Sequence, residues 1–217
     1  MRLIDQTRQG LLDYICAQIG TFLPDGRAES VRQPIDRNLD ETLDRLSKCI
    51  DAIKMWKSGE FNYLNSAQYF KLIYFLSNTI WRNEQDVNAC TKLFLLNKCL
   101  NNIDIFYEIA MPDIFLIGHT SGIVLAKANY ANYLVLHQNS TVGRQGQNIP
   151  VLGEGVIMYA GTAIIGRCHV AAGTILSAGT YLVNKDAPGN CIASFDSVGK
   201  LSFRPVRSIA LSDYFRV

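Results

Sequence analysis

Branched aliphatic residues or Met recur at every sixth position in the second half of the chain. The repeated positions are Leu152, Met158, Ile164, Val170, Leu176 and Leu182. Small residues follow the first five of them, four positions later: Val156, Thr162, Cys168, Thr174 and Thr180. A helix would scatter residues six apart around its axis. Short parallel strands joined at three corners stack them instead, so the pattern predicts a parallel β-helix.

The six-residue step extends towards the N-terminus before it breaks. Val142, Leu136 and Tyr130 keep the step, whereas Leu125 lies five positions before Tyr130. The segment 143–151, GRQGQNIPV, interrupts the run, and we expect it to form a loop extruded from the β-helix.

Apolar residues spaced three and four apart predict helices in the first half of the chain. The stripes cover the stretches 11–19, 39–53, 69–80 and 87–100. Asn65 followed by Gln68 resembles a capping box ahead of the third stretch. Pro24-Asp25-Gly26 is expected to break the chain after the first helix, and Ser58-Gly59 to end the second.

The fold class predicted is therefore α+β. A helical N-terminal domain over residues 1–110 precedes a β-helix domain with a C-terminal tail over residues 111–217, with Pro112 at the transition. Residues 198–205 are expected to pair as a last strand after Pro188. A helical domain at an open solenoid end covers unpaired strand edges or mediates assembly, and the sequence does not separate these roles.

Composition excludes several classes of partner. The chain has 217 residues, of which 48% are hydrophobic and 18% charged, and its net charge of +2 does not predict binding to nucleic acid. No apolar run approaches the roughly 18 residues of a spanning helix, so we expect no membrane insertion. The N-terminus lacks a signal-peptide pattern, and the six cysteines contain no CxxC pair. We expect reduced thiols and a cytoplasmic protein.

Three histidines are candidates for chemistry. His169 directly precedes the inward Val170, which assigns it to packing or the surface. His137 follows the inward Leu136, so we expect it to point outward or lie at a corner, without a direct role. His119 differs because it stands in the segment GHTSGIVL.

That segment, residues 118–125, resembles the His-x-x-Gly-[Ile/Thr]-Val segment of the serine acetyltransferase branch of the hexapeptide acyltransferases. LHQNSTVG, residues 136–143, is similar to the Gln-x-x-Thr-[Leu/Val/Ile]-Gly segment of the same branch, and LGEGVIMYAGTAIIG, residues 152–166, to its later coils. The resemblance covers residues 111–190 well and the helical half in outline.

The resemblance implies a left-handed β-helix that forms a homotrimer, with acetyl-CoA as co-substrate in a groove between subunits and no metal. It implies that His119 is the general base, which takes the proton of an acceptor hydroxyl as the oxygen attacks the thioester. Histidine suits this role, because its unperturbed pKa of about 6.5 leaves it largely neutral near pH 7.

Two departures from the family concern the acceptor. Serine acetyltransferases carry an Asp immediately before this His, where the chain has Gly118, and a second His in the loop, where it has Gln147, Asn148 and Ile149. We therefore expect an O-acetyltransferase that acts on a sugar hydroxyl, in the biosynthesis of a surface polysaccharide such as capsule or lipopolysaccharide. The alternative is a serine O-acetyltransferase with an altered pocket.

The departures from the family and the repeat itself give further candidate site residues. Asp113 is a candidate carboxylate to orient His119, and is equally explained as a turn or cap residue. Small residues at corners would let the backbone approach the pantetheine arm. The candidate contacts of acetyl-CoA are Tyr159, Ala160, Gly161, Ala178 and Gly179, with Lys185 for a phosphate and Lys200, Arg204 and Arg207 as further cations.

Two readings from other classes remain open. A zinc-dependent, carbonic-anhydrase-like β-helix would need three protein ligands. His119 and His137 are 18 residues apart, about one coil, but His169 is out of step with them. The second alternative is a trimeric scaffold without catalytic activity.

Overall fold

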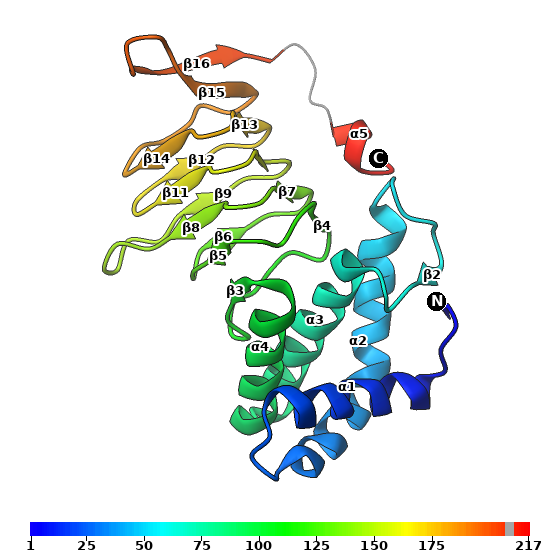
Figure 1. Ribbon diagram of the computed structural model, residues 1–217. Coiled ribbons are helices and arrows are strands. Elements are labelled where there is room, and N and C mark those ends of the chain that lie inside the picture. The colour runs from blue at the N-terminus through cyan, green and yellow to red at the C-terminus, as the bar shows by residue number, and fades with distance from the viewer. Residues whose placement is uncertain (207–210) are drawn as a thin grey trace. The chain divides into compact units, whose positions relative to one another are not determined.

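The computed structural model describes residues 1–206 and 211–217, apart from the side chain of Ala28. The chain forms two compact units. The first contains residues 1–52 and 56–108, and the second contains residues 53–55 and 109–217. Figure 1 shows helices in the first unit and stacked strands in the second, as the α+β prediction requires.

Helices dominate the first unit, and the four predicted helices are present. They are α1 (Arg8–Phe22), α2 (Arg32–Ala52), α3 (Ser66–Glu84) and α4 (Val87–Asn101), with the short helix η1 (Ala28–Val31) before α2. The strands β1 (Arg2–Leu3) and β2 (Glu60–Phe61) pair in parallel, and β3 (Ile103–Ile105) follows α4. Every residue of α3 from Gln68 to Ile80 is buried, so α3 forms the centre of this unit.

The helix ends agree with the sequence only in part. Asn65 caps α3, because its side chain accepts hydrogen bonds from the backbone N–H groups of Ala67 and Gln68. The capping-box prediction is wrong for Gln68, whose Oε1 accepts from the N–H of Asn62, 2.8 Å away. The predicted end of α2 at Ser58-Gly59 is also wrong. The helix stops at Ala52, and Asp51 accepts hydrogen bonds from Ser58 Oγ and Gly59 N.

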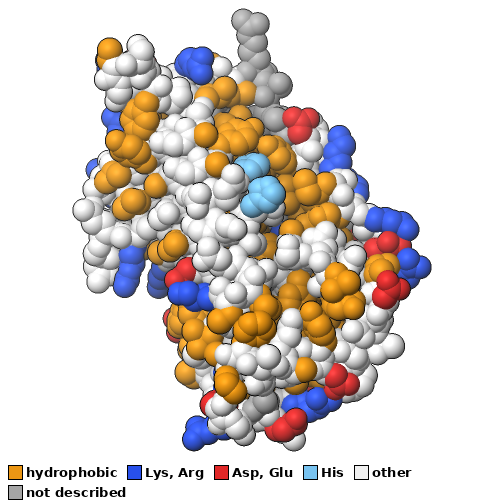
Figure 2. Space-filling view, viewed as in Figure 1, with side chains coloured by type: hydrophobic (Ala, Val, Ile, Leu, Met, Phe, Trp, Pro, Cys, Tyr) orange, Lys and Arg blue, Asp and Glu red, His pale blue; other side chains and the backbone are white. Residues whose placement is uncertain are grey.

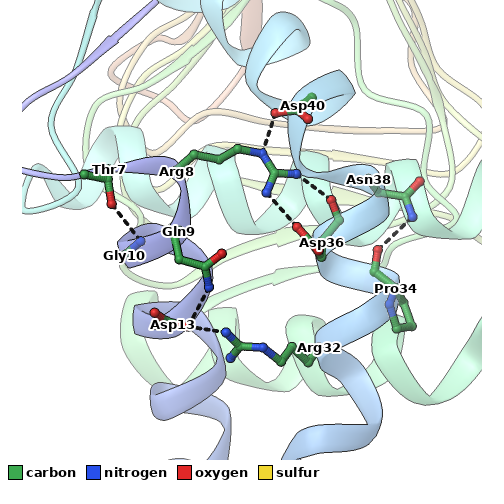
Figure 3. A network of polar contacts seen from close by, with 10 residues as sticks. All are labelled: Thr7, Arg8, Gln9, Gly10, Asp13, Arg32, Pro34, Asp36, Asn38 and Asp40. Atoms are coloured by element: carbon green, nitrogen blue, oxygen red, sulfur yellow. Dashed lines mark hydrogen bonds and ion pairs between the residues drawn. The ribbon is translucent and has the colours of Figure 1, made fainter.

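Ion pairs join α1 to α2 at the surface of the first unit (Figure 3). Arg8 donates to the carboxylates of Asp36 and Asp40 at 2.6 and 2.7 Å, and Arg32 pairs with Asp13. These pairs are solvent-exposed, so each stabilises the unit little. They fix which faces of the two helices meet.

The second unit is a β-helix with three faces. The first face contains β4 (Phe115–Ile117), β7 (Leu134–Leu136), β10 (Ile157–Met158), β13 (Thr174–Leu176), β15 (Cys191–Phe195) and β16 (Leu201–Pro205). The second face contains β5 (Ile123–Leu125), β8 (Thr141–Gly143), β11 (Ala163–Ile165) and β14 (Tyr181–Val183). The third contains β6 (Asn129–Tyr130), β9 (Val151–Leu152) and β12 (His169–Val170).

The six-residue repeat is the core of this prism. All six repeated aliphatic positions from Leu152 to Leu182 are at most 2% exposed. Most of the small residues four positions later hold the corners. The side chains of Thr162 and Thr174, and of Ser140 at the equivalent position four residues after Leu136, each donate a hydrogen bond of 2.7 Å to the carbonyl three residues earlier. The repeat therefore encodes both the buried stack and the turns between faces.

The interruptions of the repeat are where the sequence places them. Residues 144–148 are exposed and form the predicted loop, closed by hydrogen bonds between Gln145 and Asn148. The expected last strand is β16, which pairs antiparallel with β15, whereas the coils pair in parallel. A short helix, α5 (Leu211–Tyr214), follows near the C-terminus.

Two further expectations concern the whole chain. All six cysteines are free thiols, and five of them are buried. In the parts of the chain that the structure describes, no helix is long and apolar enough to cross a membrane.

Candidate functional site

His119 lies on an enlarged corner of the β-helix. Ile117 pairs with Leu136 and Leu125 with Val142, so eight positions separate the paired residues in this coil and six in the next. The two additional residues make the corner wider, and His119 is exposed there. The N–H of Asn139 donates to the carbonyl of Ser121 at 2.9 Å, which ties the enlarged corner to the next coil.

We call the connection between the first and second faces the first corner. It comprises residues 118–122, 137–140, 159–162 and 177–180 in four successive coils. None of these residues is Lys, Arg, Asp or Glu. The first corner is therefore an uncharged column that carries both His119 and His137.

His137 is part of an aromatic cluster at the first corner. Its imidazole stacks on the ring of Tyr159 in the next coil, with centroids 5.1 Å apart and planes at 25°. Tyr214 of α5 meets the imidazole edge-on at 6.4 Å, and its hydroxyl lies 3.4 Å from that of Tyr159. Figure 2 shows histidine side chains together on the surface with hydrophobic side chains around them.

The corner position expected for His137 is confirmed. Its surroundings, however, differ from those of an exposed surface residue. His137 is half-buried, and the strand register sets Gln138, rather than His137, opposite His119. Gly118 faces the imidazole, because a Cβ at position 118 would lie 3.5 Å from Nδ1 of His137. The missing side chain at position 118 thus leaves this space to His137.

Burial controls the electrostatics of the cluster. Burial lowers the pKa of His137, and the nearby His119 lowers it further, so the neutral imidazole is favoured. Burial and the contact with Tyr159 raise the pKa of Tyr214 to about 12, so its hydroxyl keeps its proton at neutral pH. Two buried atoms of the first corner, Nε2 of His137 and Oε1 of Gln138, have no hydrogen-bond partner among the described residues.

Asp113 does not meet His119. It precedes β4, whereas His119 follows it, and three extended residues span about 10 Å. Asp113 is exposed, and no hydrogen bond or ion pair joins it to His119 within residues 1–206 and 211–217. The orienting role predicted for its carboxylate has no contact to support it here.

The small residues predicted to contact acetyl-CoA do form one surface. Ala160-Gly161 and Ala178-Gly179 occupy equivalent positions in adjacent coils, and both glycines have positive φ angles of 70° and 72°. Their N–H groups are already used: Gly161 donates to the carbonyl of Gln138, and Gly179 to that of Ala160. The residues allow a ligand to approach closely, but these two N–H groups are not available to it.

Lys185 lies apart from this surface. It is exposed at the second corner, between the second and third faces, where exposed cations recur once in each coil: Lys127, Arg144, Arg167 and Lys185. Lys200 and Arg204 are exposed in the β15–β16 hairpin, and Arg207 lies outside the described residues.

The three histidines do not share a site. His169 is exposed on β12 of the third face, as its assignment to the surface predicts. Within the described ranges, no group of three or more His, Cys, Asp or Glu side chains is arranged to hold a metal ion.

The sequence missed Tyr214 and Gln138. Tyr214 reaches the first corner from the end of the chain, 55 residues after Tyr159, and no periodicity links the two. The signal for Gln138 was available, because it occupies the position after His137 on the same corner and belongs to a segment that resembles the acetyltransferases.

A test of this geometry is the substitution Tyr214→Ala. We expect the pKa of His137 to rise towards its ordinary value, because removal of the ring exposes the imidazole to water and favours its charged form. Titration of the imidazole resonances by NMR measures the change. Tyr214→Phe, which keeps the ring, is the control. An unchanged pKa in Tyr214→Ala would show that Tyr214 does not bury His137.

Of the comparisons with known proteins, the one with solved structures bears on the fold. No family model matches the chain, and no curated protein matches it. Solved serine acetyltransferases are similar. The enzyme from Vibrio cholerae O1 biovar El Tor N16961 has a TM-score of 0.70 at 16% identity over 95% of this chain and 83% of that one. The enzyme from Brucella abortus strain S19 has a TM-score of 0.70 at 17% identity, over 92% of this chain and 85% of that one. The enzyme from Neisseria gonorrhoeae has a TM-score of 0.66 at 16% identity, over 94% of this chain and 81% of that one.

These identities establish similarity of fold. The helical part followed by a β-helix that the sequence predicted is confirmed, as is the resemblance to the serine acetyltransferase branch with its left-handed hexapeptide-repeat β-helix.

Proposed function

We propose that the protein is an acetyl-CoA-dependent O-acetyltransferase with His119 as the general base. The observation that carries the proposal is the position of His119. It is exposed on an enlarged corner of a serine-acetyltransferase-like β-helix, and the same corner carries alanine and glycine in two of the later coils. A general base must reach the acceptor hydroxyl. No described side chain forms a hydrogen bond with His119, so its imidazole is available to the acceptor.

The reaction needs one base and no covalent enzyme intermediate. A neutral nitrogen of His119 takes the proton of the acceptor hydroxyl while the oxygen bonds to the thioester carbon. The tetrahedral intermediate then collapses as the C–S bond breaks, and the imidazolium returns the proton to the sulfur of CoA. The products are an acetyl ester and CoA with a free thiol.

Two groups of residues suit two parts of one acetyl-CoA molecule, the pantetheine arm and the phosphates. The surface of Ala160, Gly161, Ala178 and Gly179 suits a narrow pantetheine arm, because side chains do not obstruct it. Lys185, with the other cations of the second corner, suits the phosphates.

The acceptor has two candidates. The comparisons favour serine over a sugar, since the similar structures are serine acetyltransferases. Gly118, and the absence of a histidine from the loop 144–150, favour a different acceptor such as a sugar hydroxyl in a surface polysaccharide. We retain the sugar as the second candidate for this reason.

We also propose that the protein works as a homotrimer in the cytoplasm, where its six thiols stay reduced. Apolar side chains on the second face support assembly: Val124, Tyr181 and Val183 are 44%, 56% and 48% exposed. Light scattering should give three times the mass of one chain. A stable monomer with full activity would contradict the trimer.

The substitution His119→Ala tests the proposed function. Release of CoA from acetyl-CoA in the presence of L-serine or a methyl glycoside should fall by about 10²–10⁴-fold, the usual contribution of a general base. The affinity for acetyl-CoA, measured by calorimetry without added metal, should change little, because the base acts on the acceptor. His169→Ala, at an exposed histidine of the third face, is the matched control.

Near-normal turnover in His119→Ala would exclude His119 as the base. A wild-type protein that does not bind acetyl-CoA would favour the non-catalytic scaffold, and a requirement for zinc would favour the anhydrase-like reading.

A further inference from the structure

Two polar atoms at the first corner are buried without a partner. Nε2 of His137 and Oε1 of Gln138 belong to consecutive residues, and neither has a hydrogen bond within the described part of the chain. A buried polar atom that lacks a partner is destabilising, so native proteins leave few of them. Both atoms lie on the corner that carries His119, which makes a ligand of that site their natural partner.

The imidazole of His137 is held in one orientation. Tyr159 stacks against one face at 5.1 Å, Tyr214 meets it edge-on, and Gly118 lies beside Nδ1. Such a fixed ring is pre-organised to bind a ligand, because little side-chain entropy is left to lose.

The groups around His137 determine what it can bind. The titratable groups that face it are His119, Tyr159 and Tyr214, and Asp213 acts on Tyr214 from the exposed side of α5. The first corner itself has no Lys, Arg, Asp or Glu in four coils. An ammonium or carboxylate bound there would find no opposite charge on this corner, whereas a hydroxyl can both donate and accept hydrogen bonds.

We propose that His137 and Gln138 bind hydroxyl groups of the acceptor, next to the hydroxyl that His119 deprotonates. The acceptor class is then an uncharged polyhydroxylated molecule, such as a sugar, rather than a zwitterionic amino acid. Nε2 of His137 forms a hydrogen bond with one hydroxyl, and Oε1 of Gln138 accepts a hydrogen bond from another. This inference rests on the proposed function and selects the second of its two acceptor candidates, the sugar, over serine.

The substitution His137→Leu removes the hydrogen bond, His137→Gln keeps a polar atom, and His169→Leu is the matched control. The wild-type chain and each variant are given acetyl-CoA with water alone, with L-serine, or with methyl α-glucopyranoside. Release of CoA is followed in each case. Circular dichroism and light scattering check the fold and assembly of every variant.

We expect the glycoside to accelerate CoA release in the wild type. In His137→Leu, kcat/KM for the glycoside should fall by about tenfold or more, the effect of a lost hydrogen bond that leaves its partner unsatisfied. The loss with the glycoside should exceed any loss of release with water alone, because a role limited to structure would lower both rates alike. His137→Gln should recover part of the loss, and His169→Leu should behave as wild type.

A second measurement does not depend on any variant folding. In the wild type, saturation with the glycoside should shift the ¹⁵N resonance of Nε2 of His137 and leave that of His169 in place. The inference is overturned if the Nε2 resonance does not respond. It is also overturned if His137→Leu lowers release with water as much as with the glycoside, or if serine alone accelerates release. If neither acceptor accelerates release in the wild type, the proposed O-acetyltransferase function fails, and the role of His137 fails with it.

Discussion

The stacking of one buried aliphatic side chain per face, coil upon coil, is the constraint on which the second unit depends. Leu152, Ile164 and Val170 are at most 2% exposed, and each lies in register with an equivalent residue in a neighbouring coil. A residue added within a strand would turn this side chain out of the core. Faces therefore have fixed length, and only corners tolerate additional residues.

Two connections between faces contain additional residues. By strand register, the segment that carries His119 contains two more residues than the equivalent segment of the next coil, and the loop 144–150 extends between the second and third faces. Neither enlargement disturbs the parallel register of the later coils. The enlarged first corner exposes His119, while the regular corner beside it keeps His137 half-buried against Tyr159. Because only corners accept additional residues, neighbouring coils place one exposed and one half-buried histidine on the same corner.

The predictable part of the structure is the part encoded by short periods. The six-residue step specified the β-helix, and stripes of three and four residues specified α1 to α4, because each pattern depends on neighbours along the chain. Asn65 was predictable as a cap for the same reason. Handedness was not contained in the spacing and came only from the family resemblance.

Contacts between distant segments were not predictable. Tyr214 packs on His137 because the C-terminal residues fold back, and Lys54 N–H donates to the Tyr214 carbonyl at 2.8 Å. That pairing also explains why the sequence placed the end of α2 too late: residues 53–55 belong to the second unit. The one-residue offset between His119 and His137 depends on the size of a corner, which hydrophobic spacing alone does not measure.

The central claim is that the first corner carries out acetyl transfer at His119. A crystal structure of the protein with bound CoA tests it most directly. The account predicts the CoA thiol beside the His119 imidazole, with the pantetheine arm over Ala160, Gly161, Ala178 and Gly179. A thiol bound on another face, or away from the first corner, would contradict it.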